Sequence, residues 1–201
     1  MTTLISLRAL VRRDLKDEDA ANYRWTDAEI DRAIDKALSD YSLRCPLQEL
    51  TELATVINST NVDISTLTDL IDITRVEHPI TTPPYPSHTF SFWKNKLLFL
   101  DGHVGDGTNC YVYWLKRHTL GATSSIPTAH ETVIAIGAAA YALSSLAQYQ
   151  TDKANTGGPK VDNDYSAWAK EMFTRFDKEL SVICTYNNKK IKFSSLSSEE
   201  S

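Results

Sequence analysis

The residues best suited to chemistry in this chain are a few histidine, cysteine and carboxylate side chains in short stretches. His130-Glu131 begins like the HExxH signature, in which two histidines one helical turn apart bind zinc. Ile134 occupies the position of the second histidine, so a zinc site would lack a ligand. We therefore predict that Glu131 belongs to the start of a helix and that no metal binds there.

The glycine-rich stretch Asp101–Gly107, DGHVGDG, is a second candidate site. Asp101, His103 and Asp106 are possible metal ligands, and acidic residues with glycine are typical of calcium loops. Their spacing departs from the EF-hand pattern, and no glutamate closes the loop. We favour a hairpin turn over a calcium site at this position.

Two further patterns are relevant to catalysis. Gly157–Lys160, GGPK, lacks the first glycine of a phosphate-binding loop, and Val161 stands where that motif needs serine or threonine. Cys45, Cys110 and Cys184 are odd in number and widely separated, which predicts no disulfide framework and a reducing compartment. A cysteine–histidine pair distant in sequence stays an open alternative. We expect that the protein is not an enzyme and needs no cofactor.

The elements that would position these residues begin with two helices. Leucines from Leu4 to Leu15 recur at the spacing of one helical face. Thr26 and Glu29 then have the spacing of a capping box at the start of a second helix. Apolar residues from Ile30 onward recur on one face of it, and Pro46 stops it, because the residue before a proline avoids helical angles.

The middle of the chain favours strands. Alternating or aromatic-rich segments suggest a small antiparallel sheet with strands at 51–57, 70–76, 89–93, 97–100 and 109–116. The prolines between 79 and 86 exclude that stretch from a central strand.

Helical patterns return near residue 127. Either Pro127 is the first helical residue, or Thr128 and Glu131 form a second capping box. The helix that follows is almost entirely apolar and rich in alanine, so we expect it at the centre of the helical core. A last helix, capped by an acidic residue between 162 and 164, has one apolar face up to residue 183.

These patterns predict an α+β fold, a four-helix bundle with an inserted small antiparallel β-sheet subdomain. The expected parts are an N-terminal helical pair at 1–46, a β insertion at 47–120, a C-terminal helical pair at 121–184 and a flexible tail at 185–201. The predicted bundle core comprises Trp25, Ile30, Ile34, Leu38, Ile136, Ala139, Leu143, Trp168, Phe173 and Phe176.

Charge and hydropathy bear on the partners. The formal net charge is −5, which argues against a general nucleic-acid binder. Residues 14–40 alone hold nine acidic and four basic side chains. The longest apolar run, Val133–Leu146, is short for a membrane span, so we expect no membrane partner.

Two groups of residues, one aromatic and one basic, each allow two interpretations. Trp93, Tyr111, Tyr113 and Trp114 suggest either a base-stacking platform for single-stranded nucleic acid or aromatic packing in a sheet or subunit interface. Few basic residues lie near them, which favours packing. The basic and apolar segment Lys189–Phe193 is either a solvated end or a segment that becomes ordered against a partner.

Several of these segments carry a family resemblance. LRALVRRDL at 7–15, with YRWTDAEIDRAIDKALSDYS at 23–42, resembles the opening of head-to-tail adaptor (connector) proteins of tailed bacteriophages. His118-Thr119-Leu120 followed by IPTAHETVIAIGAAAYAL, and the closing DYSAWAKEMFTRFDKEL, are also similar to that family. The order helix, helix, sheet, helix, helix matches such adaptors.

The resemblance implies a structural virion protein. Members form a ring of about twelve copies beneath the portal, join it to tail or nozzle proteins and let DNA pass through the lumen. The expected partners are thus other copies of this chain, the portal and tail proteins, with DNA present only in passage. The expected location is the virion neck, after assembly in the host cytoplasm.

The resemblance also assigns roles to residues. The C-terminal segment docks on the portal in several members, and by position this role falls on Lys189, Lys190, Ile191, Lys192 and Phe193. The acidic segment would face the lumen or its rim, where like charge repels DNA; its residues include Asp14, Asp17, Asp31 and Asp35. The alternatives are a neck or tail-completion protein of the same particle, a small nucleic-acid-binding regulator, or an enzyme.

Overall fold

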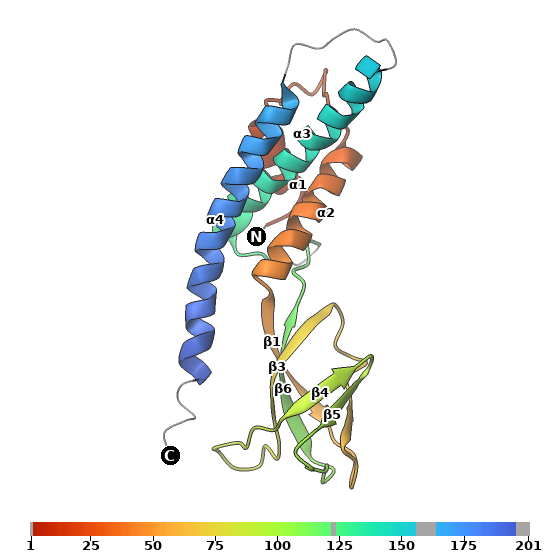
Figure 1. Ribbon diagram of the computed structural model, residues 1–201, viewed down its shortest axis with the longest axis vertical. Helices are drawn as coiled ribbons and strands as arrows, with labels where there is room; N and C mark the ends of the chain where they lie inside the picture. The colour runs from red at the N-terminus through yellow and green to blue at the C-terminus, as the bar shows by residue number, and fades with distance from the viewer. Residues whose placement is uncertain (1, 122–123, 156–163, 196–201) are drawn as a thin grey trace. The chain divides into compact units, whose positions relative to one another are not determined.

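Helices begin and end the chain, and the strands lie between them, as the computed structural model in Figure 1 shows. The structure describes residues 2–121, 124–155 and 164–195. The elements are α1 (Leu4–Asp14), α2 (Asp27–Arg44), β1 (Leu47–Ala54), β2 (Asn61–Asp63), β3 (Leu70–Glu77), β4 (Phe90–Trp93), β5 (Lys96–Phe99), β6 (Asn109–Lys116), a 3-10 turn (Thr128–His130), α3 (Glu131–Asn155) and α4 (Tyr165–Ser195). The fold is therefore α+β.

The chain divides into two compact units. Unit 1 comprises residues 1–45 and 118–201, and unit 2 is the continuous segment Pro46–Arg117. The predicted boundaries, after residues 46 and 120, lie within three residues of these divisions. Each unit has its own cluster of buried apolar residues.

The predicted capping box of α2 is confirmed. The Thr26 hydroxyl accepts a hydrogen bond from the Glu29 amide at 3.3 Å, and the Glu29 carboxylate accepts one from the Thr26 amide at 2.8 Å. These bonds satisfy amides that have no partner inside the helix. The helix ends at Arg44, directly before Cys45 and Pro46, as the proline predicts.

The start of α3 follows neither predicted alternative. Pro127 has an extended backbone and precedes a 3-10 turn, so it is not the first helical residue. Glu131 begins α3, but its carboxylate accepts a 2.6 Å hydrogen bond from the hydroxyl of Thr2. A residue 129 positions away in the chain therefore takes the carboxylate that a local capping box would have used.

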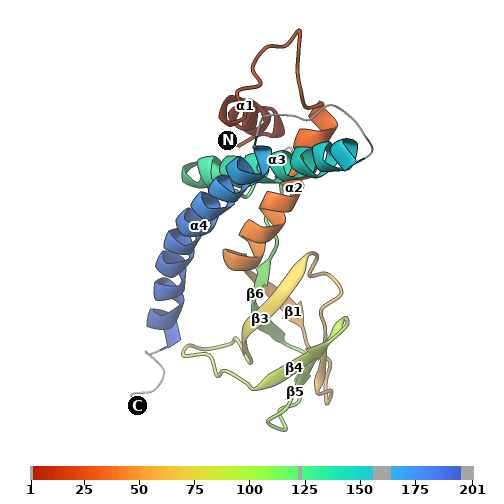
Figure 2. The same ribbon diagram turned by 45° about the horizontal axis from the view of Figure 1, so that its top comes forward.

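Helix α3 is the centre of unit 1. It packs against α1, α2 and α4; Figure 1 shows it between α2 and α4, and in the view of Figure 2 it crosses α2. Many of its buried side chains are small, including Ala135, Ala138 and Ala139, so neighbouring helices approach closely. At Gly137 an added Cβ would lie 2.8 Å from the Phe176 ring of α4.

Eight of the ten predicted core residues are buried, and two are not. Trp168 and Phe173 are only half-buried. Both lie on the predicted apolar face of α4, but Phe176 and Leu180 occupy the most enclosed positions of that face. The buried eight are Trp25, Ile30, Ile34, Leu38, Ile136, Ala139, Leu143 and Phe176.

Unit 2 contains two antiparallel sheets instead of the single sheet expected. One has the order β1-β6-β3, and the other has the order β2-β5-β4. Strands β1 and β6 pair over their full length, from Leu47 opposite Lys116 to Ala54 opposite Asn109. The short strand β2 is not among the predicted strands, because three residues carry too little alternation to predict one.

Both sheets of unit 2 contribute to one buried cluster. Ile73, Val112 and Trp114 enter it from the first sheet, and Leu97 and Phe99 enter it from the second. The loop between β5 and β6 makes tight turns at Gly102 and Gly107, whose φ angles of 78° and 88° favour glycine.

Candidate functional sites

Within the acidic segment, Asp17 is buried in unit 1 and cannot face a lumen. Its carboxylate accepts a 2.7 Å hydrogen bond from Arg12 and bonds of 2.7 and 3.3 Å from the amides of Arg24 and Trp25. The Asp17 side chain is 6% exposed, and that of Arg12 is 7% exposed. The sequence prediction for this residue is wrong, because its charge is used inside the protein.

Two further carboxylates of this segment bind arginines of α1. Asp31 accepts two hydrogen bonds from Arg8, at 2.6 and 2.5 Å. Asp27 binds both Arg8 and Arg12, and the hydrogen bond from Arg12 lowers the pKa of the Asp27 carboxyl. These ion pairs join α1 to α2, so much of the negative charge of the segment is compensated.

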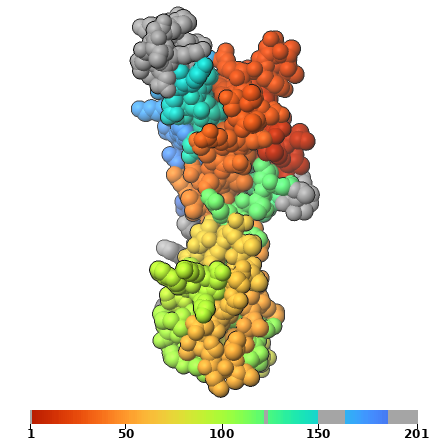
Figure 3. All heavy atoms as spheres, turned by 90° about the vertical axis from the view of Figure 1, so that its right-hand side faces the viewer, coloured from red at the N-terminus to blue at the C-terminus, as the bar shows by residue number. Residues whose placement is uncertain are grey.

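Asp14 and Asp35 complete the predicted set. Asp14 is half-buried at the end of α1, and desolvation raises the pKa of its carboxyl. Asp35 is exposed on α2, which lies at the surface in Figure 3. Of the four predicted aspartates, only Asp35 is fully exposed to solvent.

The predicted tail begins inside a helix. Helix α4 continues to Ser195, eleven residues beyond Cys184, where the bundle was expected to end. Residues 185–195 contain no glycine or proline to stop a helix that is already formed. The segment Lys189–Phe193 thus lies in the last turns of α4, and its side chains are outside the described ones. The last predicted tail residues, 196–201, also lie outside the described part.

A disulfide contradicts the prediction from cysteine number. Cys45, which follows α2, is bonded to Cys184 of α4, with Cα atoms 5.6 Å apart. Cys110 is buried in unit 2, where burial raises the pKa of its thiol to about 11. The odd number of cysteines therefore reflects one pair in unit 1 and one apolar thiol in the other unit.

Replacing Cys184 with serine should remove the redox dependence of unit 1 stability. The disulfide joins residues 139 positions apart, and closing so long a loop typically stabilises a protein by about 2–4 kcal/mol. We expect the wild type to melt at a higher temperature without reductant than with it, and the Cys184→Ser variant to melt equally in both. Cys110→Ala should keep the difference; its loss there would contradict the pairing.

The four aromatic residues considered as a base-stacking platform do not share a face. Trp114 points into the core of unit 2, while its strand neighbours Tyr111 and Tyr113 point to the opposite side of β6. Trp93 belongs to the other sheet and is 78% exposed. A continuous stacking surface would need these rings side by side, so this arrangement favours packing.

Of the residues considered for metal binding, none has the geometry of a metal site. His130 binds the hydroxyl of Tyr41 through Nδ1 at 2.6 Å, and Glu131 binds Thr2. In the loop between β5 and β6, Asp106 accepts a hydrogen bond from the Thr108 hydroxyl at 2.6 Å. Over the part of the chain that the structure describes, no group of three or more metal-ligating side chains is found. The predicted Gly157–Lys160 linker lies outside that part.

The sequence did not indicate that His103 has histidine neighbours. His78 follows β3 and His88 precedes β4, and both side chains lie against His103. Nothing in their spacing links the three, because they come from separate segments that the sheets bring together. Only their shared location in the strand-rich third of the chain could have suggested the cluster.

One hollow of unit 1, of about 580 Å³, is lined by residues that include Arg24, Trp25, Tyr165 and Trp168. Arg24 donates a hydrogen bond to the Tyr165 hydroxyl, and Asp17 binds Arg12. These polar groups are therefore engaged in contacts within the protein.

Comparisons with known proteins do not assign this chain to a protein family. Neither the protein-family models nor the curated proteins contain a match to this chain. One helical stretch, Thr128–Tyr149, is long and apolar enough to cross a membrane by length and composition, and 56% of its apolar window is buried inside the protein. The packing of α3 against the three other helices accounts for this composition.

Proposed function

We propose that this protein is a head-to-tail adaptor of a tailed bacteriophage, a structural virion protein that forms a ring under the portal and lets DNA pass. The finer fold belongs to the same proposal: a four-helix bundle with an inserted β subdomain. The observation that carries it is the central position of α3, whose alanine-rich surface contacts the three other helices. This arrangement agrees with the segments that resemble adaptors.

Ring formation needs two different patches on each copy, which meet in a head-to-tail manner. Two units with separate cores supply two such surfaces. Exposed aliphatic side chains occur on both, for example Ile5 and Val182 on unit 1 and Val56 and Ile57 on unit 2. In the ring these side chains would contact neighbouring copies.

We assign fewer aspartates to the lumen than the sequence predicted. Asp35 is exposed, Asp14 and Asp31 are half-buried, and Asp17 is excluded because it is buried. We place the exposed face of α2 that carries Asp35 toward the lumen or its rim, where this carboxylate would repel passing DNA. A ring structure with this face directed outward would contradict the assignment.

Co-expression with the portal protein of the same genome tests the function. We expect a chain that is monomeric alone and forms a closed ring on the portal, visible by electron microscopy of the purified complex. A ring further from the portal, bound only to tail proteins, would favour the neck or tail-completion alternative. Binding to neither would overturn the virion proposal.

The end of α4 is the proposed portal contact. Truncation after Tyr186 removes Lys189–Phe193, and we expect portal pull-down to be lost. Replacing Lys189, Lys190 and Lys192 with glutamine should weaken binding to the portal. The affinity of this variant should also depend less steeply on salt concentration than that of the wild type, because fewer ion pairs form. The matched control replaces Lys170 and Lys178, which are exposed on the same helix. Undiminished binding by the truncated chain would contradict this contact.

A further inference from the structure

Three of the five histidines of the chain form a cluster in unit 2. Nδ1 of His78 lies 2.6 Å from Nε2 of His103, and the two ring centroids are 4.9 Å apart. The rings of His88 and His103 are stacked, with centroids 3.8 Å apart and planes inclined by 21°. The cluster joins the end of β3, the segment before β4 and the loop between β5 and β6.

Hydrogen bonds define where His78 carries its proton. Its Nε2 atom lies 3.0 Å from the Asp106 carboxylate and 3.1 Å from the Thr108 hydroxyl. That hydroxyl donates its own proton to Asp106, so only oxygen lone pairs face Nε2. His78 therefore donates from Nε2, and its Nδ1 accepts a hydrogen bond from Nε2–H of His103. His78 is fully buried.

His88 has acceptors at both ring nitrogens. Nε2 lies 2.6 Å from the backbone oxygen of His78, and Nδ1 lies 2.8 Å from the Asp101 carboxylate. A carbonyl and a carboxylate both accept hydrogen bonds, so each ring nitrogen of His88 faces an acceptor. The hydrogen bond with His88 lowers the pKa of the Asp101 carboxyl.

His103 is the ring that has to stay neutral. Its ring stacks on the ring of His88, so a proton on His103 would lie against a second histidine ring, whose own charge opposes it. Desolvation is the largest cause that lowers the pKa of His103, and repulsion from the protonated forms of His88 and His78 adds to it, while Asp101 and Asp106 oppose the shift. Among the described side chains, these two aspartates are the carboxylates bonded to the cluster, and Phe99 covers it with an apolar ring.

We propose that His78, His88 and His103 form an acid-sensitive clasp, which holds the loop between β5 and β6 against the His78–His88 segment at neutral pH and releases it at mildly acidic pH. Protonation of His103 opens the clasp by repulsion from His88. The freed loop carries Val104, which is 43% exposed in the closed form, so acidification exposes further apolar surface.

The sign of the pH effect follows from proton linkage. In the open loop the His103 pKa returns toward 6.5, and in the clasp it is lower. The open form therefore binds more protons below about pH 6.5, so the closed form loses stability as the pH falls from there toward the lowered pKa. The closing equilibrium changes by at most about tenfold per pH unit for one such proton.

Hydrogen exchange of the intact protein between pH 7.5 and 5.0, with a chelator present, tests the clasp. After correction for intrinsic rates, we expect protection of the loop amides at 101–108 to fall as the pH decreases below 6.5, by at most about tenfold per pH unit. Amides of α3 should keep their protection, because α3 belongs to unit 1 and all three histidines of the cluster belong to unit 2. Unchanged loop protection would overturn the proposal.

Two variants separate the clasp from general acid sensitivity. In His103→Gln the amide still donates to His78 but does not titrate, so the acid response of the loop should disappear. The control His130→Gln alters a histidine of unit 1 and should leave the response unchanged. If His103→Gln fails to fold, the wild-type NMR titration decides the matter: His103 must titrate below the free value in step with loop opening. A response that persists without His103 titration would overturn the proposal.

Discussion

Replacing Asp17 with alanine should lower the free energy of unfolding of unit 1 by about 3–5 kcal/mol. The change leaves the Arg12 guanidinium, which is 7% exposed, without its buried partner at 2.7 Å. It also removes the acceptor of the Arg24 and Trp25 amides. A buried charge or donor without a partner keeps its full desolvation penalty. The measurement is urea unfolding followed by circular dichroism.

The control for this variant is Asp35→Ala. Asp35 belongs to the same acidic segment but is exposed on α2, so its loss should change stability by less than about 0.5 kcal/mol. Arg12 retains Asp27 and the backbone oxygen of Trp25 in the Asp17 variant. A decrease in the free energy of unfolding of less than about 1 kcal/mol would mean that these contacts and water replace the Asp17 carboxylate. The buried ion pair would then not be what holds the 15–25 loop in place.

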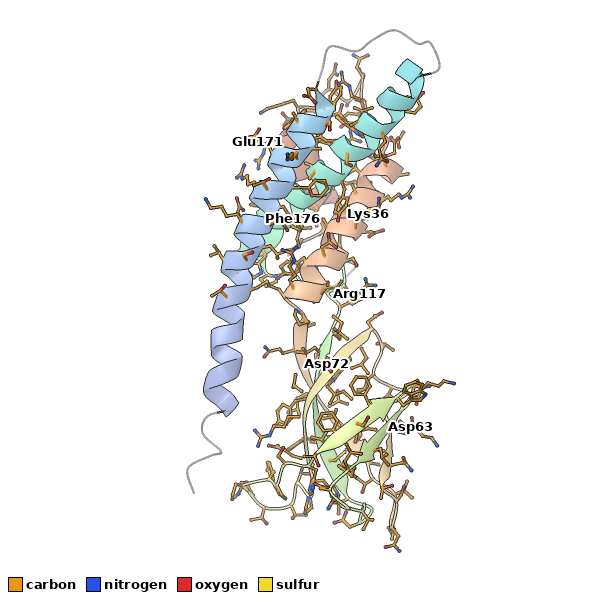
Figure 4. The ribbon with its side chains drawn as sticks, in the orientation of Figure 1. Lys36, Asp63, Asp72, Arg117, Glu171 and Phe176 are labelled. Carbon is orange, nitrogen blue, oxygen red and sulfur yellow. A yellow bond between two sulfur atoms is a disulfide. The ribbon has the colours of Figure 1, made fainter. Side chains whose placement is uncertain are left out.

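Replacing Phe176 with alanine should cost about 3–5 kcal/mol, the usual range for a buried phenylalanine. The ring is 2% exposed and lies against Gly137 on α3; Figure 4 labels it on α4. Its removal leaves a cavity between two long helices that cannot close without moving their backbones. Thermal unfolding should show a large decrease in Tm.

Substitution of Gly137, which contacts the Phe176 ring, tests whether this cost arises from the contact between α3 and α4. Gly137→Ala alone should destabilise the protein, since its Cβ would lie 2.8 Å from the Phe176 ring. In the Phe176→Ala background the same change should be neutral or stabilising, because space is available and alanine favours helix by about 1 kcal/mol. Additive effects in the double variant would contradict the close contact. Phe173→Ala, at a half-buried position, should cost less than Phe176→Ala.

Local patterns in the sequence were sufficient for most helices and for two of the three longer strands; the third, β1, was predicted at 51–57 and runs from Leu47 to Ala54. The capping box of Thr26 and Glu29 and the face containing Ile30, Ile34 and Leu38 depend on residues three or four positions apart. Such residues meet as soon as the helix forms. The strands at 70–77 and 109–116 were similarly visible from their composition. The end of α4 was missed, because its predicted end rested on polarity and the helix continues through polar residues.

Contacts between elements could not be read from the sequence in this way. The division of the strands into two sheets, the disulfide between Cys45 and Cys184, and the cluster of His78 and His103 each join residues far apart in the chain. Asp17 was interpreted as surface charge, because nothing in its spacing indicates that the chain folds back to enclose it with Arg12. The sequence by itself determined which side chains share a face of one element. Tertiary structure decided which faces meet, because pairing depends on chain reversal and packing rather than on local spacing.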